Sequence, residues 1–169
     1  EQLPQCAAVV DPHRPDRTYP HTMLSGVGIA FKLAAALSGD QDAVARRYCD
    51  LICLGTIADV MTLQGENRRL VVMGLEALRQ PQRLGLRALI HACGCDEQEI
   101  TAGTIGDILA PRVNAAGRME QAELAVRLFL TQDPQEADRL AETLCRLNRE
   151  RQTIESEIYS EAVSRLHGA

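Results

Sequence analysis

The chain has 169 residues, enough for one domain with a sizeable hydrophobic core. Its net charge of -5 excludes a uniformly basic nucleic-acid-binding protein, so any contact with a polyanion must come from a local cluster of arginines. No apolar run approaches the roughly 18 residues of a membrane span and no signal peptide opens the sequence, so we expect no membrane partner.

The N-terminal quarter predicts a strand, a loop and a helix, in that order. Residues 6–10 (CAAVV) form a short apolar run between proline-containing turns and predict a buried strand. Residues 11–20 hold three prolines and predict a loop. Ser25 is placed to cap a helix that follows it, in which Gly26 and Ala30, four residues apart, are expected to allow close helix packing.

Apolar residues at helical spacing predict the middle of the chain to be helical. One helix is expected over residues 42–58 and a second over 65–79, the latter beginning at Glu66 or Asn67. A shorter helix leads to Gly94, a plausible C-terminal cap.

The last predicted element is a long helix. Asp133, Pro134 and Glu136 match an N-cap, a first helical position and a third position, and no proline or glycine follows until Gly168. A helix of about 33 residues would span roughly 50 Å. Such a length suggests either a coiled-coil seam or a rigid strut toward a further domain. Because the chain also begins without methionine, both of its ends look cut from something longer.

The six cysteines suit a reducing, cytoplasmic setting better than a disulfide framework, since several lie within apolar helical patterns. His91, Cys93 and Cys95 form the compact sequence HACGC. No second ligand pair follows at zinc-finger spacing, which argues against a metal there.

Two places could carry chemistry. Asp59 follows an apolar helix, where the negative end of the helix dipole disfavours its charge, so it is either simply exposed to water or compensated by a bound cation. Arg112, Asn114 and Arg118 surround small residues in the stretch LAPRVNAAGRM. They form either a solvated turn between helices or an anion site in which two guanidinium groups hold phosphate oxygens.

Five stretches occur in a characteristic order and cover nearly the whole chain: VVDPHRPD, LSGVGIAFKLAAAL, LGTIADVMTLQGENRRLV, LAPRVNAAGRM and LNRERQTIE. With these motifs the chain resembles the RecJ family of bacterial single-stranded-DNA-specific exonucleases, within the DHH phosphoesterase superfamily. The combination of GTIADV, GENR and PRVNAAGR is specific to this family.

The resemblance implies a metal-dependent enzyme that degrades single-stranded DNA from the 5′ end to mononucleotides in DNA repair and recombination, using Mn²⁺ or Mg²⁺. It implies that Asp59 is a catalytic metal ligand and that Arg112, Asn114 and Arg118 hold DNA phosphates. The Asp-His-His motif does not occur in this sequence and would lie upstream of Glu1. A two-metal site needs several ligands, so the chain by itself is expected to be inactive. A helicase or a single-strand-binding protein are partners that the parent protein could have.

We therefore expect an α/β fold in which this chain is the mostly helical C-terminal part of a DHH-type parallel-sheet domain. Residues 1–131 would belong to that domain, and residues 132–169 would form the helix that connects it to a second domain absent here. Two alternatives remain: a non-catalytic nucleic-acid-binding or scaffolding relative, and a helical module that dimerises through its long helix.

Overall fold

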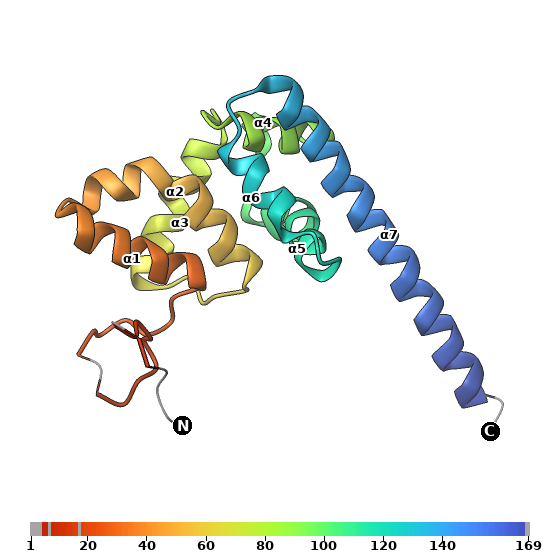
Figure 1. The fold of residues 1–169 in the computed structure, drawn as a ribbon, viewed down its shortest axis with the longest axis horizontal. Helices are drawn as coiled ribbons and strands as arrows, with labels where there is room; N and C mark the ends of the chain where they lie inside the picture. The colour runs from red at the N-terminus through yellow and green to blue at the C-terminus, as the bar shows by residue number, and fades with distance from the viewer. Residues whose placement is uncertain (1–4, 7, 17, 168–169) are drawn as a thin grey trace. The chain divides into compact units, whose positions relative to one another are not determined.

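The computed structural model describes residues 5–6, 8–16 and 18–167, and every regular element within them is helical (Figure 1). The chain folds into two compact units, residues 1–77 and residues 78–169. The α-helices are α1 (Gly26–Ser38), α2 (Gln41–Ala58), α3 (Gly65–Leu78), α4 (Leu84–Ala92), α5 (Ala110–Arg118), α6 (Ala122–Leu130) and α7 (Pro134–His167). A short 3₁₀ helix, η1 (Glu97–Glu99), and a π-helical segment, η2 (Thr104–Leu109), complete the set.

The strand predicted over residues 6–10 is wrong in the described residues. Ala8, Val9 and Val10 adopt no regular structure, and Val10 is 55% exposed, while Ala7 lies outside the described residues. A strand is stable only when its backbone groups bond to a neighbouring strand, and no other described segment supplies one. The expected α/β class is therefore not seen, whereas the expected helical content and terminal long helix are confirmed.

The first unit is built on a helical hairpin. Ser25 caps α1 as predicted, because its hydroxyl accepts a hydrogen bond from the Gly28 N–H. Gly39, in the left-handed region at φ 73°, ends α1, and the Asp40 carboxylate caps α2 directly afterwards. The two helices and α3 enclose an apolar core of buried side chains: Phe31, Ala35, Val44, Ala45, Ile52 and Leu70.

Close helix packing in this unit uses other glycines than the one predicted. Gly26 and Ala30 are both exposed, and no atom lies near the position of a Cβ on Gly26. Instead a Cβ on Gly74 of α3 would lie 2.3 Å from the Cys49 carbonyl oxygen of α2, so only glycine permits this approach. Which glycine lies at a helix contact depends on which helices meet. The spacing of residues within one helix does not reveal this.

The second unit packs α4, α5 and α6 against the first half of α7. Apolar side chains with at most 1% exposure fill the space between these helices: Leu86, Leu89, Ile105, Leu109, Leu128, Leu144 and Leu147. Gly85 at the start of α4 lies against α6, where a Cβ would come within 1.8 Å of the Leu128 carbonyl oxygen. Gly94, at φ 69°, follows the end of α4 and donates its N–H to the His91 carbonyl, which confirms the predicted cap.

Helix α7 begins as the sequence predicts. Asp133 accepts from the Gln135 N–H through its carboxylate and from the Ala137 N–H through its carbonyl, and Pro134 occupies the first helical position. Glu136 departs from a capping box, because its carboxylate accepts from Thr131 and Arg127 instead of the cap N–H. These two hydrogen bonds hold the pKa of Glu136 below its usual value and tie α6 to α7.

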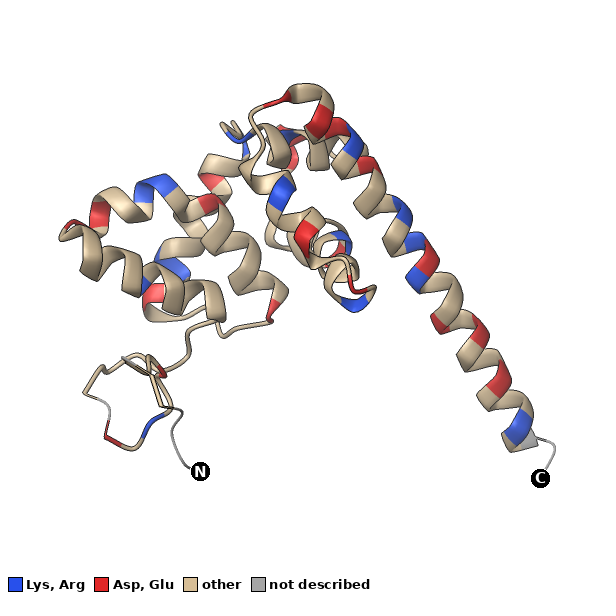
Figure 2. Cartoon of the chain, viewed as in Figure 1, with Lys and Arg blue, Asp and Glu red and all other residues tan. Residues whose placement is uncertain are grey.

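The second half of α7 extends beyond the helices it packs against (Figure 1). Leu144 and Leu147 are buried, whereas Ile158 and Tyr159 are 62% and 72% exposed. Acidic and basic residues are interspersed along this helix (Figure 2), and Arg146–Glu150, Arg151–Glu155 and Glu161–Arg165 form ion pairs four residues apart. No helix within the described residues is long and apolar enough to cross a membrane.

Candidate functional site

Asp59 is the C-terminal cap residue of α2 and is exposed. Its carboxylate makes no hydrogen bond or ion pair with any other described residue. The predicted position is therefore confirmed: a carboxylate at the negative end of a helix dipole, with no compensating cation from the described residues.

The turn after Asp59 is a Schellman motif with an unusual residue in it. The N–H of Val60 donates to Ile57 and the N–H of Met61 to Thr56, closing both bonds of the motif. Val60 occupies the left-handed position at φ 53°, where glycine is usual, and its side chain is 89% exposed. A β-branched residue is strained in this conformation, so the chain that follows Asp59 is held in a costly geometry.

We predict that Val60→Gly stabilises the chain by about 0.5–1 kcal/mol. The left-handed conformation costs an ordinary residue about 1–2 kcal/mol, and the greater freedom of glycine in the unfolded chain offsets part of the gain. Urea unfolding measures the change. Val72→Gly, in the interior of α3, is the matched control and should destabilise, because glycine is unfavourable within a helix. Equal destabilisation by both substitutions would contradict the strain at Val60.

The GTIADV and GENR stretches mainly build the scaffold around Asp59. Thr56 is buried with its hydroxyl 3.3 Å from that of Ser25, which joins the end of α2 to the start of α1. Gly55 lies against Val27, whose Cγ1 would be 2.7 Å from an added Cβ. Asn67, expected only as a helix start, is 1% exposed and donates to the carbonyls of Met23 and Thr62.

Glu66 completes this scaffold by pairing with Lys32, the single lysine of the chain. Tyr19 donates a 2.8 Å hydrogen bond to the same carboxylate, and the Lys32 ammonium lies 4.9 Å from the centre of its ring. Burial alone would lower the pKa of Lys32, but hydrogen bonds with Glu66 and Tyr19 outweigh it and raise the pKa. Asn67 thus ties the loop after Asp59 to the segment before α1, and Glu66 ties α3 to Lys32 of α1 and to Tyr19.

The arginine motif is helical, so its interpretation as a turn is wrong. Arg112, Asn114 and Arg118 all belong to α5, and Ala115 and Ala116 are fully buried in the core of the second unit instead of leaving room for a ligand. Helix α5 continues directly from η2 with Pro111 inside it. Proline cannot donate to the carbonyl four residues earlier and clashes with it, and the wider π-helical segment before Pro111 accommodates this.

Two of the three polar residues of the motif share a face of α5, and the third does not. Asn114 and Arg118 are four residues apart, so they share one face of α5, and both are exposed. Neither forms a hydrogen bond or ion pair with another described residue. Arg112 is half-buried, donates from Nη1 to the Ile108 carbonyl at 2.7 Å, and leaves its Nε buried without a partner in the described chain.

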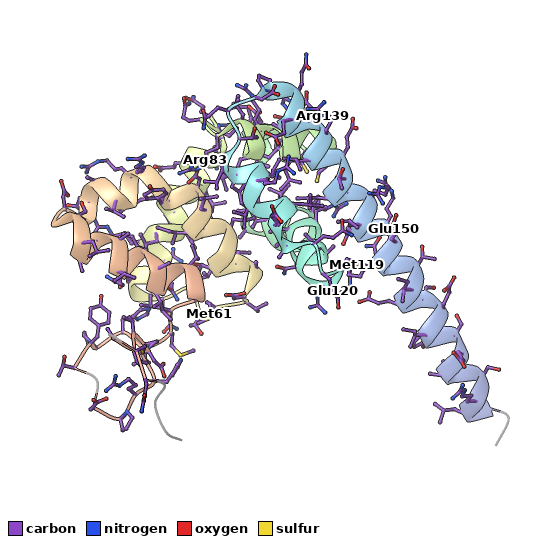
Figure 3. The ribbon with its side chains drawn as sticks, in the orientation of Figure 1. Met61, Arg83, Met119, Glu120, Arg139 and Glu150 are labelled. Atoms are coloured by element: carbon purple, nitrogen blue, oxygen red, sulfur yellow. The ribbon has the colours of Figure 1, made fainter. Side chains whose placement is uncertain are left out.

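The end of α5 repeats the geometry found after Asp59. Met119 is the cap residue, and Glu120 takes the left-handed position at φ 58°. The N–H of Glu120 donates to the Gly117 carbonyl and that of Gln121 to the Ala116 carbonyl. Figure 3 labels Met119 and Glu120 at this end of α5. Arg118 therefore sits on the last turn of a helix whose end is fixed by two backbone hydrogen bonds.

Within the part of the chain that the structure describes, no group of three histidine, cysteine or acidic side chains could hold a metal ion. Among the residues of HACGC, His91 pairs with Glu97 at 3.1 Å, and the Cys93 sulfur lies 3.9 Å from that of Cys145. The described residues therefore place no second and third metal ligand beside Asp59.

Comparison with known proteins identifies the relatives of this chain. No protein-family model matches it. It is 46% identical over 162 residues to the single-stranded-DNA-specific exonuclease RecJ of Bacillus subtilis, which covers 96% of this chain and 20% of that protein. The Escherichia coli protein of the same name is 35% identical over 177 residues, covering 97% of this chain and 31% of the relative.

Two solved structures of proteins with the same name also match this chain. RecJ from Thermus thermophilus in complex with Mg²⁺ matches 87% of this chain and 23% of its own, with a TM-score of 0.73 and 39% identity. Exonuclease RecJ bound to manganese matches 89% of this chain and 38% of its own, with a TM-score of 0.75 and 38% identity. The chain spans about a fifth to a third of the length of these curated relatives. This chain is therefore homologous to one region of the RecJ single-stranded-DNA-specific exonucleases.

Proposed function

We propose that this chain is part of a metal-dependent exonuclease that degrades single-stranded DNA from the 5′ end to mononucleotides during DNA repair and recombination. The observation that carries the proposal is similarity along almost the whole chain, 46% identity over 96% of its length, to a protein named for this activity. The region would be the C-terminal part of a DHH-type domain together with the helix that leads to a second domain.

In this proposal Asp59 contributes one carboxylate to a Mn²⁺ or Mg²⁺ site whose other ligands lie outside the described residues. Hard divalent cations prefer carboxylate oxygens, and Asp59 is exposed, unpaired and held at a helix end. When bound, the metal would activate water and stabilise the leaving oxygen. The solved relatives contain Mg²⁺ or manganese, which fits this ligand chemistry.

The arginine motif would hold the DNA backbone. Arg118 and Asn114 present two groups with hydrogen-bond donors on one exposed face of α5, and neither is engaged within the described chain. Arg112 is half-buried and bonded to the Ile108 carbonyl, and it would add its positive charge to the attraction of the strand. Single-stranded DNA is thus the proposed substrate, and a helicase or a single-strand-binding protein could supply it.

The test uses the full-length protein that contains this chain, with a 5′-labelled single strand and Mn²⁺. We expect release of labelled mononucleotides by the full-length protein and none by residues 1–169 alone, because one carboxylate does not make a two-metal site. Binding of the strand by the full-length protein without cleavage would favour the non-catalytic relative. Cleavage by residues 1–169 that Asp59→Ala abolishes would contradict the incomplete site.

A further inference from the structure

Three thiols lie together in the second unit, close enough to Arg112 for its charge to act on them. Cys93 is the cap residue at the end of α4, Cys95 follows it by two residues, and Cys145 lies in the first half of α7. The Cys93 and Cys145 sulfurs are 3.9 Å apart although the two residues are 52 positions apart in the sequence. The Cys95 sulfur lies 4.0 Å from the Cys93 carbonyl oxygen.

Neither packing nor metal binding accounts for this arrangement. Cys145 is 6% exposed, so packing as a small hydrophobic residue would account for it. Packing does not account for Cys93 and Cys95, because both are partly exposed. A thiolate metal site needs three or four ligands, and none of that size exists within the described residues. The remaining chemistry of two thiols in van der Waals contact is oxidation to a disulfide.

The pair is reachable from solvent. A groove of about 620 Å³ runs between α4 and α7, and Cys145 lines it together with Ala88, His91 and Arg146. Cys93 is itself partly exposed, so a small oxidant can approach both sulfurs without unfolding the unit, Cys145 through the groove and Cys93 directly. The sulfurs need to close by only about 2 Å to reach the bonding distance of roughly 2.05 Å.

We propose that Cys93 and Cys145 are an oxidisable dithiol that a hydroperoxide converts to a disulfide between α4 and α7. The Cys93 thiolate attacks one peroxide oxygen, the O–O bond breaks, and a sulfenic acid forms while hydroxide leaves and takes up a proton. The Cys145 sulfur then attacks the Cys93 sulfur, the S–O bond breaks, and a second water leaves. Overall, two thiols and one hydrogen peroxide give one disulfide and two waters.

This modification would close a loop that contains α5 and α6. Cross-linking two distant positions restricts the unfolded chain, so the oxidised protein should unfold at a higher temperature. The bond would be reversible, because a dithiol reductant exchanges with it. The inference does not rest on the proposed nuclease function, since it is argued from the thiols and the groove beside them.

The rate should depend strongly on pH. Burial and the neighbouring Cys145 raise the pKa of the Cys93 thiol to about 12, against the opposing charge of Arg112. Only the thiolate attacks peroxide, so the reaction is slow at neutral pH. Its rate should rise by about tenfold for each unit by which the pH is increased, up to that pKa.

The test treats the full chain with hydrogen peroxide, alkylates the remaining thiols, digests with trypsin without reduction and analyses the peptides by mass spectrometry. We expect residues 88–112 joined to residues 140–146, lighter by two hydrogen atoms than the separate peptides, with the alkyl group on Cys95 locating the bond at Cys93. The Cys95→Ser variant should keep this link and Cys93→Ser should lose it. Oxidation should raise the melting temperature by several degrees, reversed by dithiothreitol.

A control in concentrated urea separates a structural pair from random coupling. Link formation should fall at least tenfold there, because the two sulfurs are no longer held together. A link that forms equally well in urea, a bond located at Cys95, or oxidation of Cys93 to sulfinic acid without any link would each overturn the proposal.

Discussion

In the full-length protein, Asp59→Ala is expected to lower nucleotide release from single-stranded DNA by about a thousandfold or more. Metal ions supply several kcal/mol of transition-state stabilisation, and each 1.36 kcal/mol corresponds to a factor of ten. Affinity for the strand should change by less than about threefold, because Asp59 would serve the metal and not the phosphates. A nuclease assay in Mn²⁺ and a gel shift in Ca²⁺ measure the two effects separately.

Asp42→Ala is the matched control for this experiment. Asp42 lies at the other end of α2 and pairs with Arg69 on the surface at 3.1 Å, so its loss removes the same charge from the same helix. Exposed pairs of this kind are worth about 1 kcal/mol at most, and activity should stay near that of the unmodified protein. Equal loss of cleavage and binding on Asp59→Ala, together with a lower melting temperature, would show that Asp59 serves the fold.

Arg118→Ala should weaken binding of single-stranded DNA by roughly ten- to a hundredfold, because a hydrogen bond to a charged group contributes about 1.5–3 kcal/mol. Each phosphate contact releases counterions, so the dependence of log affinity on log salt should become shallower by about 0.7. The loss should be similar on oligonucleotides of different composition, since phosphate contacts do not read bases. Fluorescence anisotropy against salt, on two such strands, measures all three quantities.

The structure makes Arg118 a clean test and Arg112 a poor one. Arg118 is exposed and bonds to no other described residue, so its removal should change the free energy of unfolding by less than about 0.5 kcal/mol. Arg112 bonds to the Ile108 carbonyl, and its loss would also disturb the helix. Arg87→Ala, an exposed arginine of α4 in the same unit, controls for charge alone. An unchanged salt slope with a large drop in melting temperature would assign Arg118 to the fold.

Local rules of helix capping are sufficient to predict where several of the helices begin and end. Ser25, Gly94 and the segment from Asp133 to Pro134 each act as the sequence predicts, because a cap is decided by residues within one turn. The exposed Asp59 at the end of α2 follows from the same kind of reasoning. These features need no information about distant parts of the chain.

Features that depend on distant contacts were missed. Residues 6–10 have the composition of a strand but no described strand to pair with. Pro111 suggested a turn, yet the π-helical segment before it keeps the chain helical and places Ala115 and Ala116 in the core. The burial of Asn67, which bonds two loops, could be inferred only once Met23 and Thr62 were known to be its neighbours.

Manganese binding by the full-length protein tests most directly whether this chain supplies a metal ligand. Electron paramagnetic resonance of free Mn²⁺ during titration gives the number of bound ions and their affinity, without reference to cleavage or to DNA. Asp59→Ala should lose one bound ion or weaken its affinity at least tenfold, as expected when a ligand or its immediate support is removed, while Asp42→Ala binds as the unmodified protein does. Unchanged manganese affinity and number in Asp59→Ala would contradict the assignment of Asp59 to the metal.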